Sequence, residues 1–272
     1  MTDVKRVQEI LLMPIVEINR IKNTNELKIE ITENGEINST QLYSAALDCD
    51  MSDFAVGFYQ TIYEVIIPDQ VILKEDKSFN DDNFAGDTMN SFNRTAGKAY
   101  KEGINGKEDK EHFVNVGKHR NDKRRSIKNY DNWPKHMQQY HKIGCCLANF
   151  WILPMDLGRT GIGDPINKML NARDYMDMYL LRICYEKVFE EPPEKYAKYF
   201  DRANFNGFED FCNKHFINSY LNENNTVIKY SYISDSEKIV DEITKRIHRR
   251  AEDISKEYAN HLWGYFKNRG LV

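Results

Sequence analysis

The stretch SDSEKIVDEITKRIHRRAEDISKEYANHLWGYFKN, at residues 234–268, does most to decide the fold. Ser234 and Glu237 are spaced as a capping box, in which a hydroxyl and a carboxylate satisfy free amides at a helix start. One face of the predicted helix is apolar and consists of Ile239, Ile243, Ile247, Ile254, Tyr258 and Leu262. The basic side chains of Lys245, Arg246, Arg249 and Arg250 lie mostly on the other face. At 1.5 Å per residue the helix is about 50 Å long, so it packs across a domain or against a partner.

The rest of the chain contains shorter periodic segments. Apolar residues at helical spacing predict helices at 40–49, 88–102, 133–150, 164–189 and 207–221, and at 4–22 with a break at Pro14. Alternating residues predict strands at 26–32, entering a hairpin turn, and at 226–233. Segment 53–67 fits a buried helix or a strand equally well.

These elements predict a mainly α-helical single domain, 1–272, with a small N-terminal β-sheet or hairpin. Three parts are distinguished within it. Residues 1–80 are mixed α/β, residues 81–130 form a polar and basic connecting region, and residues 131–272 form the helical core.

Composition excludes several classes of protein. Of the 272 residues, 41% are hydrophobic and 12% aromatic, which is enough for a sizeable core and argues against global disorder. A net charge of −4 gives no overall attraction to nucleic acid or to a membrane surface. The polar start and the absence of a long apolar run predict a cytoplasmic chain without a membrane segment. The odd number of cysteines, five, predicts reduced, buried thiols.

Asp87 and Asn90 are the first candidates for chemistry, in the segment GDTMNSF at residues 86–92. An aspartate after a glycine and a polar loop is well placed to cap a helix. Alternatively, Asp87 and Asn90 present oxygens to a shared pocket, as a hard metal ion or a general base requires.

His141 is the second candidate. His136 lies five residues earlier, about 140° away on a helix, so the two do not share a face. His141 and Cys145 do share one, but this spacing alone makes a weak zinc site, and no metal site is predicted. A core histidine bonded to a backbone group is the alternative.

Asp174 and Asp177 are the third candidates, three residues apart on the predicted helix 164–189. Both can face the same neighbour, and two such carboxylates repel unless something holds them. That partner is Arg173 or Arg182 in an ion pair, a metal ion, or a proton.

A basic segment lies at residues 117–128, with the sequence GKHRNDKRRSIK. Its basic side chains are Lys118, Arg120, Lys123, Arg124, Arg125 and Lys128. It is either a solvated loop or a surface that contacts the phosphates of nucleic acid. It contains no aromatic residue on which a base could stack.

Three segments resemble a family of uncharacterised bacterial proteins, a domain of unknown function found mainly in Firmicutes and their phages. The first is GDTMNSF at 86–92. The second contains His141, Ile143, Gly144, Asn149, Phe150 and Pro154, with residues 145–148 inserted. The third is Arg173-Asp174-Tyr175-Met176-Asp177, where Met176 replaces a tryptophan of the family. The likeness covers about residues 80–260 and implies an intracellular bacterial or phage protein, without implying a reaction.

More distantly, the second segment resembles the G-N-L-x-L-L segment of HNH-type restriction nucleases, although the upstream H-x-x-P histidine of those enzymes is missing.

These residues and resemblances leave two candidate functions. In the first, Asn90, Asn149 and Arg173 build a structural polar core, and the chain binds another protein without a cofactor, through its C-terminal helix and basic segment, for example in phage–host conflict. In the second, Asp87, Asp174 and Asp177 hold a divalent ion, and His141 orients or deprotonates water to cleave nucleic acid.

Overall fold

The structure is a computed structural model. The residues that it describes are 2–15, 30–31, 37–38, 50, 52–67, 72–76, 80, 83–90, 135–157, 163–166, 175–185, 187–233 and 235–272.

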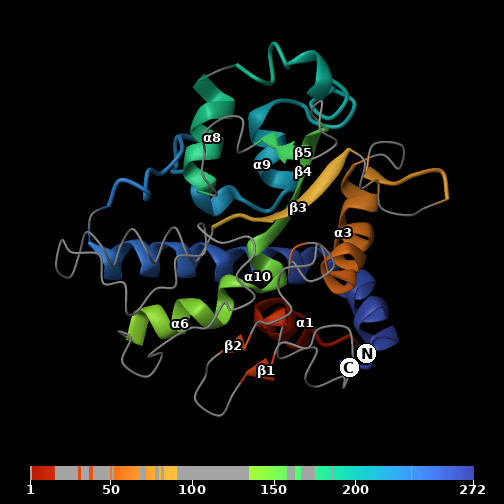
Figure 1. The fold of residues 1–272 in the computed structure, drawn as a ribbon, viewed down its shortest axis with the longest axis vertical. Coiled ribbons are helices and arrows are strands. Elements are labelled where there is room, and N and C mark those ends of the chain that lie inside the picture. Colours follow the sequence, from red (N-terminus) through yellow and green to blue (C-terminus); the bar gives the residue numbers. More distant parts are fainter. Residues whose placement is uncertain are drawn as a thin grey trace.

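Helix α10 (Ser236–Asn268) crosses the middle of the molecule and then turns toward the C-terminus (Figure 1). Asp235 caps its start, because the side chain accepts hydrogen bonds from the backbone amides of Glu237 and Lys238. The predicted cap was therefore wrong by one residue, and Ser234 itself lies outside the described residues. The predicted apolar face is confirmed, since the isoleucines and the leucine are fully buried and Tyr258 nearly so: Ile239, Ile243, Ile247, Ile254, Leu262 and Tyr258.

Three helices from earlier in the chain pack against α10. They are α1 (Val4–Leu12), α3 (Asp53–Ile66) and α6 (Lys135–Gly144). Helix α1 ends two residues before Pro14, as the predicted break requires. Segment 53–67 is a helix because its buried residues recur at helical spacing and because the Ser52 hydroxyl caps it, accepting from the amide of Ala55 at 3.2 Å.

An antiparallel sheet of order β3-β4-β5 lies between helix α3 and helix α8 (Met176–Tyr185) (Figure 1). Its strands are β3 (Phe84–Thr88), β4 (Phe150–Leu157) and β5 (Gly163–Pro165). The first four residues of β4, Phe-Trp-Ile-Leu, are aromatic or aliphatic and suit a buried strand. At Gly86 a Cβ atom would lie 2.3 Å from the Asp50 carbonyl oxygen and 2.5 Å from the Tyr59 hydroxyl, so only glycine permits this approach of β3 to α3.

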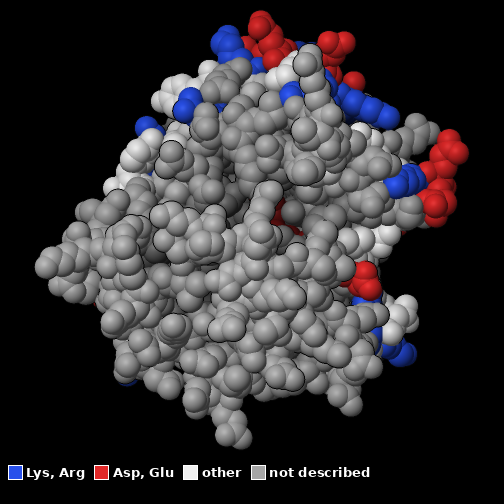
Figure 2. Space-filling view, in the orientation of Figure 1, with Lys and Arg blue, Asp and Glu red and all other residues white. Residues whose placement is uncertain are grey.

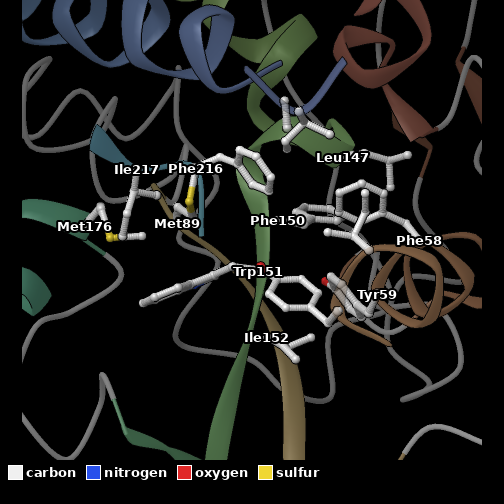
Figure 3. Close-up of a cluster of buried hydrophobic side chains, with 14 of the residues drawn as sticks. Phe58, Tyr59, Met89, Leu147, Phe150, Trp151, Ile152, Met176, Phe216 and Ile217 are labelled. Carbon is white, nitrogen blue, oxygen red and sulfur yellow. The ribbon is translucent and has the colours of Figure 1, made fainter. Parts of the chain in front are cut away.

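The core lies on both faces of β4. Figure 3 shows Trp151 pointing to one side, toward Met89 and Met176, whereas Phe150 points to the other side, toward Phe58. This alternation is the normal consequence of strand geometry. The sheet is therefore covered by α3 on one face and by α8 on the other.

Between α8 and α10 the described chain is built from short elements. These are the 3-10 helices η6 (Glu194–Tyr196) and η7 (Asn218–Tyr220) and helix α9 (Phe208–Lys214). They pack largely through aromatic rings, with Phe211 and Phe205 centroids 5.1 Å apart and Phe189 and Phe211 centroids 5.3 Å apart.

The mainly helical character is confirmed, and the predicted N-terminal hairpin is present as β1 (Glu30–Ile31) paired antiparallel with β2 (Ile37–Asn38). The extent of the sheet was underestimated, because the three-stranded sheet was predicted as loop and helix. Among the described residues, no helix combines the length and the apolar character that a membrane crossing requires.

Four predicted segments were wrong in detail. Helix 133–150 ends at Gly144 and is followed by η5 (Leu147–Asn149) and then β4. Of the predicted helix 164–189, residues 163–165 form a strand and α8 begins only at Met176. Segment 207–221 is divided between α9 and η7, because Phe216 adopts a left-handed conformation. Segment 226–233 forms a single bridge, between Val227 and Leu221.

Candidate functional site

The structure describes the side chains of four predicted site residues: Asp87, Asn90, Asn149 and Asp177. For His141 it describes the backbone alone, within α6. Arg173, Asp174 and the basic side chains Lys118, Arg120, Lys123, Arg124, Arg125 and Lys128 lie outside the described residues.

Asn90 and Asn149 meet in the interior, both fully buried. Asn90 lies two residues after the end of β3, and it forms an isolated antiparallel bridge with Tyr175. Asn149 ends η5, and its amide donates to the carbonyl oxygens of Asn90 at 3.0 Å and Gly144 at 2.7 Å. Both N–H groups of Asn149 are therefore used to hold the end of α6 against the end of β3.

Three buried tyrosines surround Asn90. Its amide nitrogen donates to the hydroxyl of Tyr220 at 2.7 Å and more weakly to the side-chain oxygen of Asn149 at 3.4 Å. Its amide oxygen accepts from the Tyr230 hydroxyl, and its backbone oxygen accepts from the Tyr140 hydroxyl at 2.8 Å. Burial raises the pKa of Tyr220 to about 12, so this phenol stays neutral. We call Asn90, Asn149, Tyr140, Tyr220 and Tyr230 the asparagine–tyrosine cluster.

Asp177 lies beside this cluster, in the first turn of α8, and is fully buried. One carboxylate oxygen accepts from the backbone amide of Ser231 at 2.9 Å and from its hydroxyl at 2.7 Å, which occupies both lone pairs. The other oxygen accepts from the amide of Met178 at 2.9 Å. Burial raises the pKa of Asp177, and the bonds from Ser231 and Met178 and the charge of Arg246 oppose that rise.

Arg246 connects α10 to the cluster. Its guanidinium carbon lies 5.6 Å from the ring centre of Tyr220 and 5.2 Å from that of Tyr230. It also donates to the Glu242 carboxylate at 2.6 Å. The side chain is only 5% exposed. Its placement on a basic face opposite the apolar face was therefore wrong, because the arginine packs against buried tyrosine rings.

The assignment of Arg250 was wrong for the same reason. Its guanidinium donates to the carbonyl oxygens of Ala148 at 3.0 Å, Phe150 at 2.6 Å and His215 at 3.0 Å. A fourth partner is the Tyr63 hydroxyl, at 3.3 Å. Arg250 thereby satisfies buried carbonyl oxygens at the junction of η5 and β4. Because two of them, those of Ala148 and Phe150, flank Asn149, Arg250 also fixes the position of that asparagine.

His215 was not predicted as a polar residue of the core. Its ring lies between the hydroxyls of Tyr63, 3.2 Å from Nδ1, and Tyr199, 3.0 Å from Nε2. Burial, together with the nearby charges of Arg250 and Lys214, holds the pKa of His215 well below its ordinary value. It is therefore neutral, with one ring nitrogen donating and the other accepting. The available signal was the spacing of Phe208, Phe211 and His215, which are three and four residues apart and so share one helix face.

Asp87 does not cap a helix, because it lies inside β3 opposite Trp151. This correction follows from the aromatic and aliphatic sequence of β4, which pairs with residues 84–88. Asp87 is 8% exposed, and one of its oxygens accepts from the amide of Thr88 at 2.9 Å. Its side chain is therefore almost completely buried.

The weak zinc site considered from the sequence involves His141, whose side chain lies outside what the structure describes, so it stays untested. Across the described residues, no three histidine, cysteine, aspartate or glutamate side chains gather closely enough to hold a metal ion. Cys145 and Cys146 lie just before η5, and burial raises the pKa of the Cys146 thiol to about 12. Such a thiol is a poor nucleophile and a poor metal ligand at neutral pH.

The chain matches no family model, no curated protein and no solved structure. The resemblance of residues 86–92 and of the two later segments to a bacterial and phage family therefore remains an expectation from sequence.

Proposed function

We propose that this chain is a protein-binding factor whose asparagine–tyrosine cluster is a structural polar core. The observation that carries the proposal is that the amide and carboxylate groups of that core bond to other groups of the same chain. The amides of Asn90 and Asn149 and the carboxylate of Asp177 each bond to described protein groups. A buried hydrogen-bonded network of this kind favours one arrangement of the elements around it.

The nuclease alternative assigns different duties to the same residues. A carboxylate that holds a divalent ion needs an oxygen lone pair directed at the ion. In Asp177 one oxygen already accepts two hydrogen bonds from Ser231, and the side chain is fully buried. Metal binding there would first require those bonds to break, so the protein-binding function is favoured.

The partner surface is proposed to lie away from the apolar face of α10, because that face packs against the chain's own helices. The largest exposed apolar side chains of the described residues are Tyr185, which is 75% exposed, and Tyr232, which is 66% exposed. Exposed tyrosine is among the residues that dominate protein interfaces. The described charged residues at one end of the molecule are of both signs (Figure 2), a mixture that gives no single-sign field for nucleic acid.

Affinity capture from bacterial lysate tests the proposal, with proteins and nucleic acid both identified. A stoichiometric protein is expected with the wild type and is expected to be lost with the double variant Tyr185→Ala/Tyr232→Ala. Val65→Ala is the control, because Val65 is a 54% exposed apolar residue on α3. Capture of nucleic acid that is lost when Lys123, Arg124 and Arg125 become alanine would contradict the proposal. Metal-dependent cleavage by the wild type but not by Asp87→Ala would establish the nuclease instead.

A further inference from the structure

Two backbone irregularities face each other where the end of α9 meets α10. Phe216 has a φ of 57°, in the left-handed region that bulky side chains rarely adopt. Tyr258 interrupts α10 with φ −114° and ψ 16°. The two rings meet edge to face, with centroids 5.5 Å apart and planes at 90°. Both side chains are less than 10% exposed.

Phe216 occupies a position that glycine normally takes. The amide of Ile217 bonds to the carbonyl of Cys212 at 2.9 Å, and the amide of Phe216 bonds to that of Asn213 at 3.0 Å. This pattern ends many helices and places a left-handed residue just after the last turn. Glycine would adopt the conformation without strain, so the ring of Phe216 must be explained by what it contacts.

The bend in α10 has a second local cause. Ser255 is buried, and its hydroxyl donates to the carbonyl oxygen of Glu252 at 2.9 Å. A serine hydroxyl that bonds back to the preceding turn weakens and bends a helix. Ser255 lies three residues before Tyr258, so the helix is weakened where the Phe216 ring packs against it.

The two parts of α10 hold different neighbours. Before the bend, Arg250 donates to the carbonyl oxygens that flank Asn149. After it, the Tyr265 hydroxyl donates to the Phe54 carbonyl at 2.7 Å, and Phe266 stacks on Phe54 with ring centroids 6.2 Å apart. The first part is therefore attached to the asparagine–tyrosine cluster, and the second part is attached to α3. Figure 1 shows α10 turning between these two regions.

We propose that the contact between Phe216 and Tyr258 locks a hinge in α10. With the rings together, residues 259–268 lie on α3. When the rings separate, residues 259–268 leave α3 as a unit, while residues 236–254 stay docked on the cluster. The hinge couples the end of α9 to the surface of α3.

Hydrogen exchange measured by mass spectrometry on the full chain tests the hinge. Phe216→Ala is expected to raise exchange about tenfold in residues 259–268 and at the start of α3, which is the factor expected from losing a strong aromatic pair. Exchange in residues 237–250 is expected to stay unchanged. An equal rise in both parts of α10, or no rise in either, would overturn the proposal.

Three further variants keep the test decisive. Tyr258→Leu removes the ring from the α10 side, and it is expected to open the same residues if Phe216→Ala does not fold. Phe216→Gly removes the ring and the backbone strain together. It is expected to open residues 259–268 as alanine does, and better protection than in the wild type would refute the lock. Phe189→Ala is the matched control, because its ring packs on Phe200 and other phenylalanines of the α9 region.

Discussion

Replacing Asn90 with alanine would remove the centre of the asparagine–tyrosine cluster. The hydroxyls of Tyr220 and Tyr230, both fully buried, would each lose the Asn90 amide as a partner. A buried polar group left unpaired costs about 1–3 kcal/mol, so these two hydroxyls together give a loss of about 2–6 kcal/mol. The weaker contact with the Asn149 side-chain oxygen, at 3.4 Å, adds little.

Urea unfolding followed by circular dichroism measures this loss as a change in the free energy of unfolding at constant m. A double-mutant cycle with Tyr230→Phe measures the interaction energy between Asn90 and the Tyr230 hydroxyl, because phenylalanine removes only that hydroxyl. A coupling energy of about 1–2 kcal/mol is expected from residues in one network. Asn260→Ala, at an exposed asparagine of α10, is the control and should change stability by less than about 0.5 kcal/mol. A loss below about 1 kcal/mol for Asn90→Ala, or strict additivity with Tyr230→Phe, would refute the reasoning.

Three other substitutions test the rest of the interior. Arg250→Met keeps the volume of the side chain but leaves three buried carbonyl oxygens without their donor, and thermal unfolding should show a loss of at least about 3 kcal/mol. The pKa of Asp177 is raised by burial, so its contribution favours the folded state at low pH and is lost as pH rises from 3.8 through the folded pKa. The free energy of unfolding should be compared between the wild type and Asp177→Asn as pH rises. The wild-type value minus the variant value should fall over that range and level off above it. A difference that rises with pH would contradict this sign. Gly86→Ala forces β3 away from Asp50 and Tyr59, and it should lower the melting temperature more than Gly264→Ala, where a Cβ atom meets nothing within 4 Å.

Helix periodicity in the sequence was enough to locate α10 and its apolar face, because Ile239, Ile243 and Ile247 recur every fourth residue and Ile254 follows seven residues later. It was not enough to place Arg246 and Arg250. A hydropathy pattern assigns arginine to solvent, whereas these guanidinium groups are buried by carbonyl oxygens and tyrosine rings that come from distant parts of the chain. Such partners are fixed by tertiary contacts, which a local pattern does not contain.

The candidate site shows the same division. Asn90, Asn149 and Asp177 were singled out because polar groups in aromatic surroundings must be held by something, and each is buried and held. The identity of the holder was missed, since Ser231 and the tyrosines Tyr220 and Tyr230 lie more than 50 residues from the groups that they bond. The role of Asp87 as a helix cap was wrong because strand pairing with β4 overrides the local capping preference.

Because α10 follows in the chain every element that it packs against, it sets an order of events during synthesis. Asn90, Asn149 and the carbonyl oxygens of Ala148 and Phe150 leave the ribosome well before Arg246 and Arg250 do. Until the last helix emerges, the nascent chain carries an apolar sheet whose buried oxygens have no arginine to bind. The interior can close only once that helix is available, and the growing chain is a natural client for chaperones until then.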